Sequence, residues 1–154
     1  MSKLIFDGNT HQITLIGSAG NTIGAWAAYN NVDSHATLQH IPNGVFTVQD
    51  RVVPHPHLPS VNGPYGLYGI VRIAVPGHPG IGVHSGRANA RHLPGPQHPT
   101  MGCIRTSDDA MSAISGLMRR DALTLIEVIH NNAVGARTAS LRNRHANLGG
   151  RQRG

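Results

Sequence analysis

The order of apolar and polar residues along the chain predicts several short β-strands. Residues 3–7 alternate in polarity, and the turn Gly8-Asn9 joins them to a second apolar stretch at residues 11–16, a pattern typical of a β-hairpin. Content of β-branched and aromatic residues predicts further strands at residues 22–29, 45–49, 69–75, 80–83 and 122–129. Glycine, proline and asparagine separate these stretches, so we expect a mostly β protein.

One helix is predicted between two of these strands, from about residue 108 to residue 119. Ser107 and Asp108 are both suitable N-cap residues. Asp108 and Asp109 suit the positive end of the helix dipole, and Arg119 and Arg120 suit the negative end. The apolar side of this helix comprises Ala110, Met111, Ile114, Leu117 and Met118.

Two segments carry loop signals instead. Residues 53–66 contain four prolines, too many for a central strand or a helix, so we expect an ordered surface loop. Residues 85–100 form a long polar connection.

Length and charge indicate one folded domain followed by a basic tail. A chain of 154 residues suits a single domain, which we place at residues 1–132. The chain carries 13 Lys and Arg against 7 acids, but five of these bases lie in the tail, at Arg137, Arg142, Arg144, Arg151 and Arg153. The remaining eight nearly balance the acids, so the net charge of +6 belongs mostly to residues 133–154, which we expect to be disordered.

The chain has one cysteine, so an intrachain disulfide is excluded, and Cys103 is either a buried apolar residue or a reactive thiol. The N-terminal residues lack the apolar region of a Sec signal peptide. No apolar run approaches the roughly 18–20 residues needed to span a bilayer. We therefore expect no membrane association and a protein made in the cytoplasm, with any export by another route.

Two short segments combine the residues needed for nucleophilic acyl transfer. Residues 82–86 read Gly-Val-His-Ser-Gly, and residues 100–105 read Thr-Met-Gly-Cys-Ile-Arg. His84 ends a predicted strand, whereas Cys103 follows Gly102 and precedes the predicted helix start, where the helix dipole can lower a thiol pKa. A thiolate beside an imidazole is the minimum requirement for this chemistry.

At these residues the sequence resembles the catalytic domain of the L,D-transpeptidase family, which has the YkuD-type fold. The family signature is a histidine, a variable loop, and then Ser/Thr-x-Gly-Cys followed by an aliphatic residue and Arg or Asn. Residues 41–48 (Ile-Pro-Asn-Gly-Val-Phe-Thr-Val) resemble a second family motif, and the similarity spans residues 3–130. The resemblance implies a curved β-sheet sandwich or barrel with one or two flanking helices.

The resemblance also implies roles for individual residues. Cys103 is expected to be the nucleophile and His84 the general base, with a backbone carbonyl at Ser85 or Gly86 as the third element. Backbone N–H groups of Gly102 and Cys103 are expected to form the oxyanion hole. Four further residues are expected to bind the substrate: Arg105, as a carboxylate anchor, Gly86, Thr100 and Met101. Many relatives have histidine at the position of Met101, so substrate positioning is expected to differ here.

The chain has 11 histidines, which raises the question of a metal site. His55 and His57 share one face if the segment is extended, and His92 and His98 lie in the long connection. They have no cysteine partner and no His-Glu-x-x-His pattern. We therefore predict neither a metal nor another cofactor.

The function implied is that of a peptidoglycan L,D-transpeptidase or L,D-carboxypeptidase, which acts on stem tetrapeptides through a cysteine thioester. The missing export signal and short length resemble compact type VI secretion effectors that attack the periplasmic cell wall of a competitor. An immunity protein and the secretion machinery would then be partners. Two alternatives stay open: a catalytically silent peptidoglycan-binding module on the same fold, and a nucleic-acid-binding protein that uses the basic tail.

Overall fold

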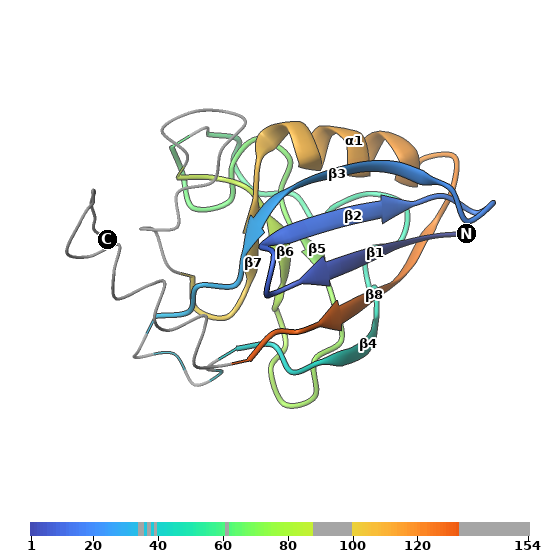
Figure 1. The fold of residues 1–154 in the computed structure, drawn as a ribbon. Helices are drawn as coiled ribbons and strands as arrows, with labels where there is room; N and C mark the ends of the chain where they lie inside the picture. Colours follow the sequence, from blue (N-terminus) through green and yellow to red (C-terminus); the bar gives the residue numbers. More distant parts are fainter. Residues whose placement is uncertain (34–35, 37, 39, 61, 88–99, 133–154) are drawn as a thin grey trace.

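The computed structural model describes residues 1–33, 36, 38, 40–60, 62–87 and 100–132. These residues form a single eight-stranded sheet and one helix, as Figure 1 shows. The elements are β1 (Ser2–Asp7), β2 (Gln12–Ile16), β3 (Thr22–Tyr29), β4 (Gly44–Thr47), β5 (Val71–Arg72), β6 (Gly82–His84), β7 (Ile104–Thr106), α1 (Asp108–Met118) and β8 (Leu123–Ile129). Their order across the sheet is β4-β8-β1-β2-β3-β7-β6-β5. The predicted mostly β architecture is confirmed.

The predicted opening hairpin is confirmed as the antiparallel pair β1 and β2. Strand β1 pairs on its other side with β8, in parallel, so the first and last strands lie side by side, one strand in from the β4 edge of the sheet. Alternation places one face of each strand inward. Leu4 and Phe6 from β1, with Ile13 and Leu15 from β2, are fully buried in the core.

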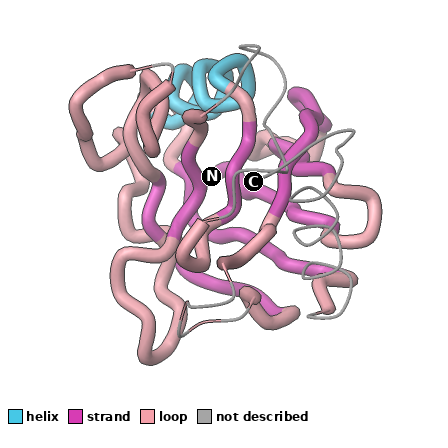
Figure 2. Tube along the Cα trace, turned by 90° about the vertical axis from the view of Figure 1, so that its left-hand side faces the viewer, coloured by secondary structure: helices cyan, strands magenta, loops and turns pink. Residues whose placement is uncertain are grey.

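The sheet curls until its two edge strands meet. Val48, just after β4, forms an isolated antiparallel bridge with Ile73, just after β5. The N–H of Gln49 also donates to the carbonyl of Arg72, at 2.8 Å. Figure 2 shows the strands following one another around this curve, with the helix at one rim. The curvature agrees with the barrel-like sheet that the family resemblance implies.

Helix α1 begins where the sequence predicts, because the Ser107 side chain accepts a hydrogen bond from the N–H of Ala110, at 3.1 Å. The helix runs along β3 (Figure 1). Its side chains Met111, Ile114 and Met118 join the core formed by the inner face of the sheet. Packing of this apolar face holds the helix against the sheet.

Two predictions about the strands near the candidate site are wrong in detail. The strand predicted at residues 69–75 is reduced to β5, because Ile70 and Ile73 instead make isolated bridges to two other segments. An additional strand, β7, separates Cys103 from the helix. Its three residues are too few to show an alternating pattern, so the sequence did not reveal it. Cys103 therefore precedes a strand, not a helix start.

The proline-rich segment is mainly loop, as predicted, although His55 pairs with Ile70 in an isolated bridge. His92, His98 and the basic tail (133–154) lie outside the described residues, so the division into a folded domain and a disordered tail stays a prediction. Within the part of the chain that the structure describes, no helix is long and apolar enough to cross a membrane.

Candidate active site

Strands β6 and β7 bring Cys103 and His84 to the same face of the sheet. The two strands are parallel neighbours in which His84 is the register partner of Arg105. Register partners point to the same face, and so do residues two apart on one strand. Cys103, immediately before β7, therefore lies on the same side as both Arg105 and His84. The structure thus brings together three residues that the sequence assigned to one site.

His84 is 3% exposed, and its ring Nδ1 lies 2.7 Å from the carbonyl oxygen of Ser85. A carbonyl only accepts hydrogen bonds, so this contact requires Nδ1 to carry the proton and leaves Nε2 with a free lone pair. Burial lowers the pKa of His84 to about 4; the Ser85 hydrogen bond opposes this shift, and the nearby Arg105 and His57 add to it. The imidazole is therefore neutral at neutral pH and suited to accept a proton.

Asp108 holds Ser85 in place, although the sequence predicts only a helix-start role for this residue. The Ser85 hydroxyl donates to Asp108 Oδ1 at 2.5 Å, and the N–H of Leu67 donates to the same oxygen at 3.3 Å. Gly66 packs so closely here that a side chain on it would overlap Ser85 Oγ. The first residue of α1 thus fixes Ser85, whose carbonyl fixes His84.

Aromatic side chains from the proline-rich loop cover the other side of His84. The Tyr65 ring lies 4.8 Å from the His84 ring, centroid to centroid, at a tilt of 56°. His57 stacks on Tyr65 at 3.8 Å with nearly parallel planes. His55 meets His57 edge to face, which confirms that these two histidines share a face. Neither Tyr65 nor this stack was identified from the sequence, since aromatic residues in a loop carry no pattern of their own.

Cys103 lies at a pocket of about 320 Å³ lined by Tyr65, Met101, Cys103 and residues 77–81. The cysteine is 9% exposed, and its thiol lies 3.9 Å from the carbonyl of Gly80. Burial raises the pKa of Cys103, although a backbone hydrogen bond at Gly82 and the charge of Arg105 act in the opposite direction. The expectation that the helix dipole lowers this pKa is wrong, because β7 stands between the thiol and the helix.

The remaining predicted residues fall into two groups. Met101 is 63% exposed and lines the pocket, so it is placed to touch a ligand. Thr100 is buried, and its hydroxyl donates to the Cys103 carbonyl at 2.6 Å and accepts from the Gly102 N–H at 3.3 Å. Thr100 therefore forms hydrogen bonds within residues 100–103, which we call the cysteine loop. Gly86, with φ of +106°, packs against the proline-rich loop instead of lining the pocket.

Arg105 is almost fully buried beside Cys103 and His84, the proposed catalytic dyad. Burial lowers its pKa to about 10, with a further contribution from the nearby Arg87, so the guanidinium still carries its charge at neutral pH. It donates to the carbonyl of Pro64, at 3.3 Å. Arg105 does not itself line the pocket, but its charge acts on Cys103 and Tyr65, which do.

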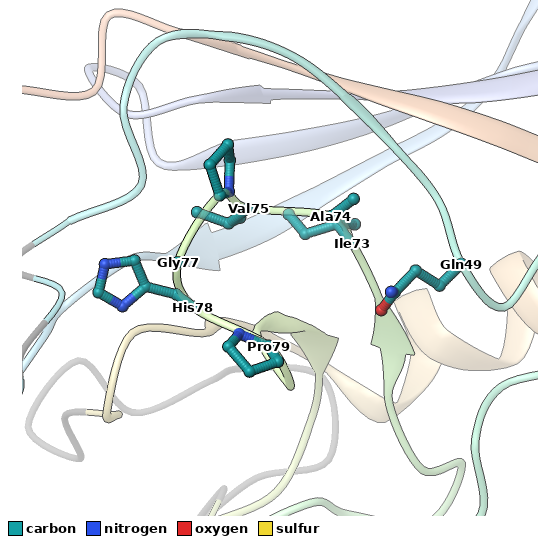
Figure 3. A pocket seen from close by; sticks show the side chains of 8 residues that line it. Gln49, Ile73, Ala74, Val75, Gly77, His78 and Pro79 are labelled. Atoms are coloured by element: carbon teal, nitrogen blue, oxygen red, sulfur yellow. The ribbon is translucent and has the colours of Figure 1, made fainter.

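A second pocket has a volume of about 300 Å³. Its lining is Gln49 with residues 73–79, which Figure 3 shows from close by. Gly77, His78 and Pro79 line both pockets, so the two pockets adjoin at this turn.

Comparison with protein-family models finds no match, and comparison with curated proteins finds none either. Solved structures do match. The helical cell shape determining protein Pgp2 from Campylobacter jejuni aligns over 90% of this chain and 52% of its own, with a TM-score of 0.60 and 11% identity. An L,D-transpeptidase from Xylanimonas cellulosilytica aligns over 82% and 59%, with a TM-score of 0.53 and 17% identity.

A third solved structure, an L,D-transpeptidase from Stackebrandtia nassauensis, aligns over 85% of this chain and 56% of its own, with a TM-score of 0.53 and 14% identity. The chain thus spans between one half and three fifths of the length of these solved chains. Identities this low establish a common architecture. The chain has the fold of the L,D-transpeptidases.

Proposed function

We propose that this chain is a cysteine acyltransferase that cuts the L,D amide bond of peptidoglycan stem tetrapeptides through a thioester on Cys103. One observation carries the proposal: Cys103 and His84 share a face of two adjacent strands, beside a pocket, with the imidazole held in the tautomer that accepts a proton. The shared fold with L,D-transpeptidases supports the choice of substrate.

The thiol and imidazole start neutral, so the first step combines proton transfer and attack. The Cys103 thiol proton passes to His84 Nε2 as the sulfur bonds to the scissile carbonyl carbon. The oxyanion that forms accepts a hydrogen bond from the backbone N–H of Cys103, whereas the Gly102 N–H is directed at the Thr100 hydroxyl. When it collapses, the carbon–nitrogen bond breaks, and His84 returns its proton to the departing D-alanine amine. A thioester on Cys103 remains.

The second step regenerates the thiol. Water attacks the thioester to give a shortened stem, which is carboxypeptidase activity, or an amine attacks to give a new amide, which is transpeptidation. His84 takes the proton of the attacking group and returns it to the sulfur. Arg105 supplies a buried positive charge for a stem carboxylate, and Met101 supplies an apolar surface at the rim.

Mass analysis of purified tetrapeptide muropeptides tests this proposal. Wild type is expected to shorten the stem by one alanine or to cross-link it, and to exchange the terminal residue when a free D-amino acid is added. The Cys103→Ala variant is expected to have none of these activities. Unchanged muropeptides with folded wild type would rule the activity out.

Burial of both reactive groups keeps one competing function in view, a silent peptidoglycan-binding module on this fold. Labelling of the single thiol separates the two. In an enzyme, His84→Ala slows labelling of Cys103 at neutral pH, because the proton acceptor is lost. In a silent module, labelling is slow in both proteins, and the protein binds peptidoglycan without altering it.

We place the action of the protein at the cell wall, as a secreted antibacterial effector. Expression in a bacterium with an added export signal is expected to stop growth, whereas cytoplasmic expression is harmless. The exported Cys103→Ala variant serves as the control. Equal growth of cells that export wild type and cells that export the variant would reject the effector role.

A further inference from the structure

A buried amide side chain lies directly behind the cysteine loop. Asn30, immediately after β3, is 2% exposed. Its Nδ2 donates to two successive backbone carbonyls, that of Gly102 at 2.9 Å and that of Cys103 at 3.1 Å. Gly102 has a φ of +136°, a conformation in which a side chain would be strained. One side chain thus holds the two peptides that flank the nucleophile in an unusual backbone path.

The geometry of the peptide bond gives these contacts a consequence for catalysis. The described chain has no cis peptide, and in a trans peptide the C=O and N–H groups point in opposite directions. The carbonyl of the Gly102–Cys103 peptide points at Asn30, so the Cys103 N–H points away from it. This N–H is one of the two expected oxyanion donors. The other, on Gly102, is directed at the Thr100 hydroxyl.

The orientation of the Asn30 amide is itself fixed from the far side. Its Oδ1 accepts from the N–H of Ile41 at 2.8 Å and from Nδ2 of Asn131 at 3.0 Å. Asn131 Nδ2 also donates to the carbonyl of Ile41, at 2.8 Å. Reversing the Asn30 amide would set its NH₂ against two donors and its oxygen against two carbonyls. The network therefore permits one orientation.

We propose that Asn30 is a positioning residue that orients the Gly102–Cys103 peptide so that the Cys103 N–H faces the developing oxyanion. The inference rests on the proposed acyl transfer and adds the group that aims its oxyanion donor. Asn30 acts through its hydrogen bonds to the backbone carbonyls of Gly102 and Cys103. Thr100 assists it, because its hydroxyl donates to the same Cys103 carbonyl and accepts from the Gly102 N–H, and so holds the peptides on either side of the Gly102–Cys103 peptide.

Two reagents that react with Cys103 distinguish the orientation of the Cys103 N–H from the reactivity of the thiol. With p-nitrophenyl acetate, the sulfur attacks the acetyl carbon, an oxyanion forms, p-nitrophenolate leaves and a thioester remains. With iodoacetamide, the sulfur displaces iodide and no oxyanion forms. Loss of an aimed donor slows the first reaction, by about 100-fold where one oxyanion donor is removed. It leaves the second largely unchanged.

Asn30→Ala and Asn131→Ala form the matched pair, because both residues are buried amides of the same network and only Asn30 contacts the loop. Rates are expressed per folded molecule. Asn30→Ala is expected to lose about 100-fold in acylation while its alkylation changes little. Asn131→Ala is expected to lose much less in acylation, because the Ile41 N–H still donates to Asn30 Oδ1, and its alkylation is expected to stay near the wild-type rate. If Asn30→Ala does not fold, Thr100→Val replaces it, with a smaller loss in acylation alone.

Each other result overturns the inference. If acylation is unchanged in Asn30→Ala, or in Thr100→Val where that variant is needed, the hydrogen bonds to the loop carbonyls do not orient the Cys103 N–H. Equal losses in acylation and alkylation mean that Asn30 acts on the thiol instead. Loss of acylation in Asn131→Ala to the same extent means a general structural effect. Failure of folded wild type to be acylated at all removes the proposed function, and this inference with it.

Discussion

The sheet contains two regions that are held together in different ways. Strands β8, β1, β2 and β3, the long-strand region, have five to eight residues each and supply much of the buried core. Strands β7, β6 and β5, the short-strand region, have two or three residues each and carry the candidate site. Ladder hydrogen bonds align the first region. The second region has ladders of only two residue pairs each, and the side chains of Asn30 and Thr100 add hydrogen bonds to its backbone carbonyls.

This division predicts that damage to the long-strand region lowers stability and leaves the chemistry of the folded molecule intact. Phe6, fully buried in β1, is the sharpest test. Phe6→Ala is expected to lower the free energy of unfolding by about 3–5 kcal/mol, because it removes a large side chain and leaves a cavity. Urea unfolding measures this loss. Acylation of Cys103 per folded molecule is expected to stay at the wild-type rate, and a large fall would break the division.

The short-strand region is expected to affect stability through pH. The folded pKa of His84 is about 4, below its ordinary value of 6.5, so the unfolded chain binds a proton that the folded chain refuses between these values. This contribution to stability is complete above pH 6.5 and is lost as pH falls towards 4, in total on the order of 3 kcal/mol.

The control is His84→Gln, which lacks the titrating group while the other histidines remain. Unfolding free energies at pH 7 and pH 4.5 are expected to differ by more in wild type than in His84→Gln. Equal differences would show that the imidazole is not buried in the folded state.

The smallest expected effect tests the brace on His84. Asp108→Asn removes the charge that holds the Ser85 hydroxyl, and acylation is expected to slow about tenfold, or roughly 1.4 kcal/mol. Asp109→Asn is the matched control: it also removes one acid from the first turn of α1, but Asp109 is exposed. Equal rates for the two variants would show that only the helix dipole is involved.

The same division separates what the sequence could predict from what it could not. In the long-strand region each strand is long enough to carry a sequence signal. The signal is alternation for β1, an apolar stretch for β2, and β-branched and aromatic content for β3 and β8, and the predicted ranges lie close to the observed ones. The helix was located from Ser107 and its apolar side. Strand β7 was missed because three residues give no periodic signal, and β5 was overestimated because its neighbours Ile70 and Ile73 bridge to other segments.

At the site, local motifs identified the reactive residues but not the groups that position them. Cys103, His84 and Arg105 were recognised from two short segments, and strand pairing places them together. Asn30 and Asp108 lie far from those segments in sequence. Asn30 sits at the start of a polar stretch, and helix capping fully accounts for Asp108, so neither gave a signal. Only the folded structure shows that Asn30 bonds the backbone of Cys103 and that Asp108 bonds Ser85, the partner of His84.

The position of β8 sets the order in which the molecule is completed during synthesis. It is the strand partner of both β1 and β4, and the hydroxyl of Thr124 donates a hydrogen bond to the carbonyl of Ser2, 122 positions earlier in the sequence. Asn131, which secures Asn30, follows β8 by two residues. Since the ribosome releases the chain from its N-terminus and distant contacts form slowly, this last strand docks late. The cysteine emerges before β8, and the hydrogen-bond network behind its loop is complete only when β8 and Asn131 are in place.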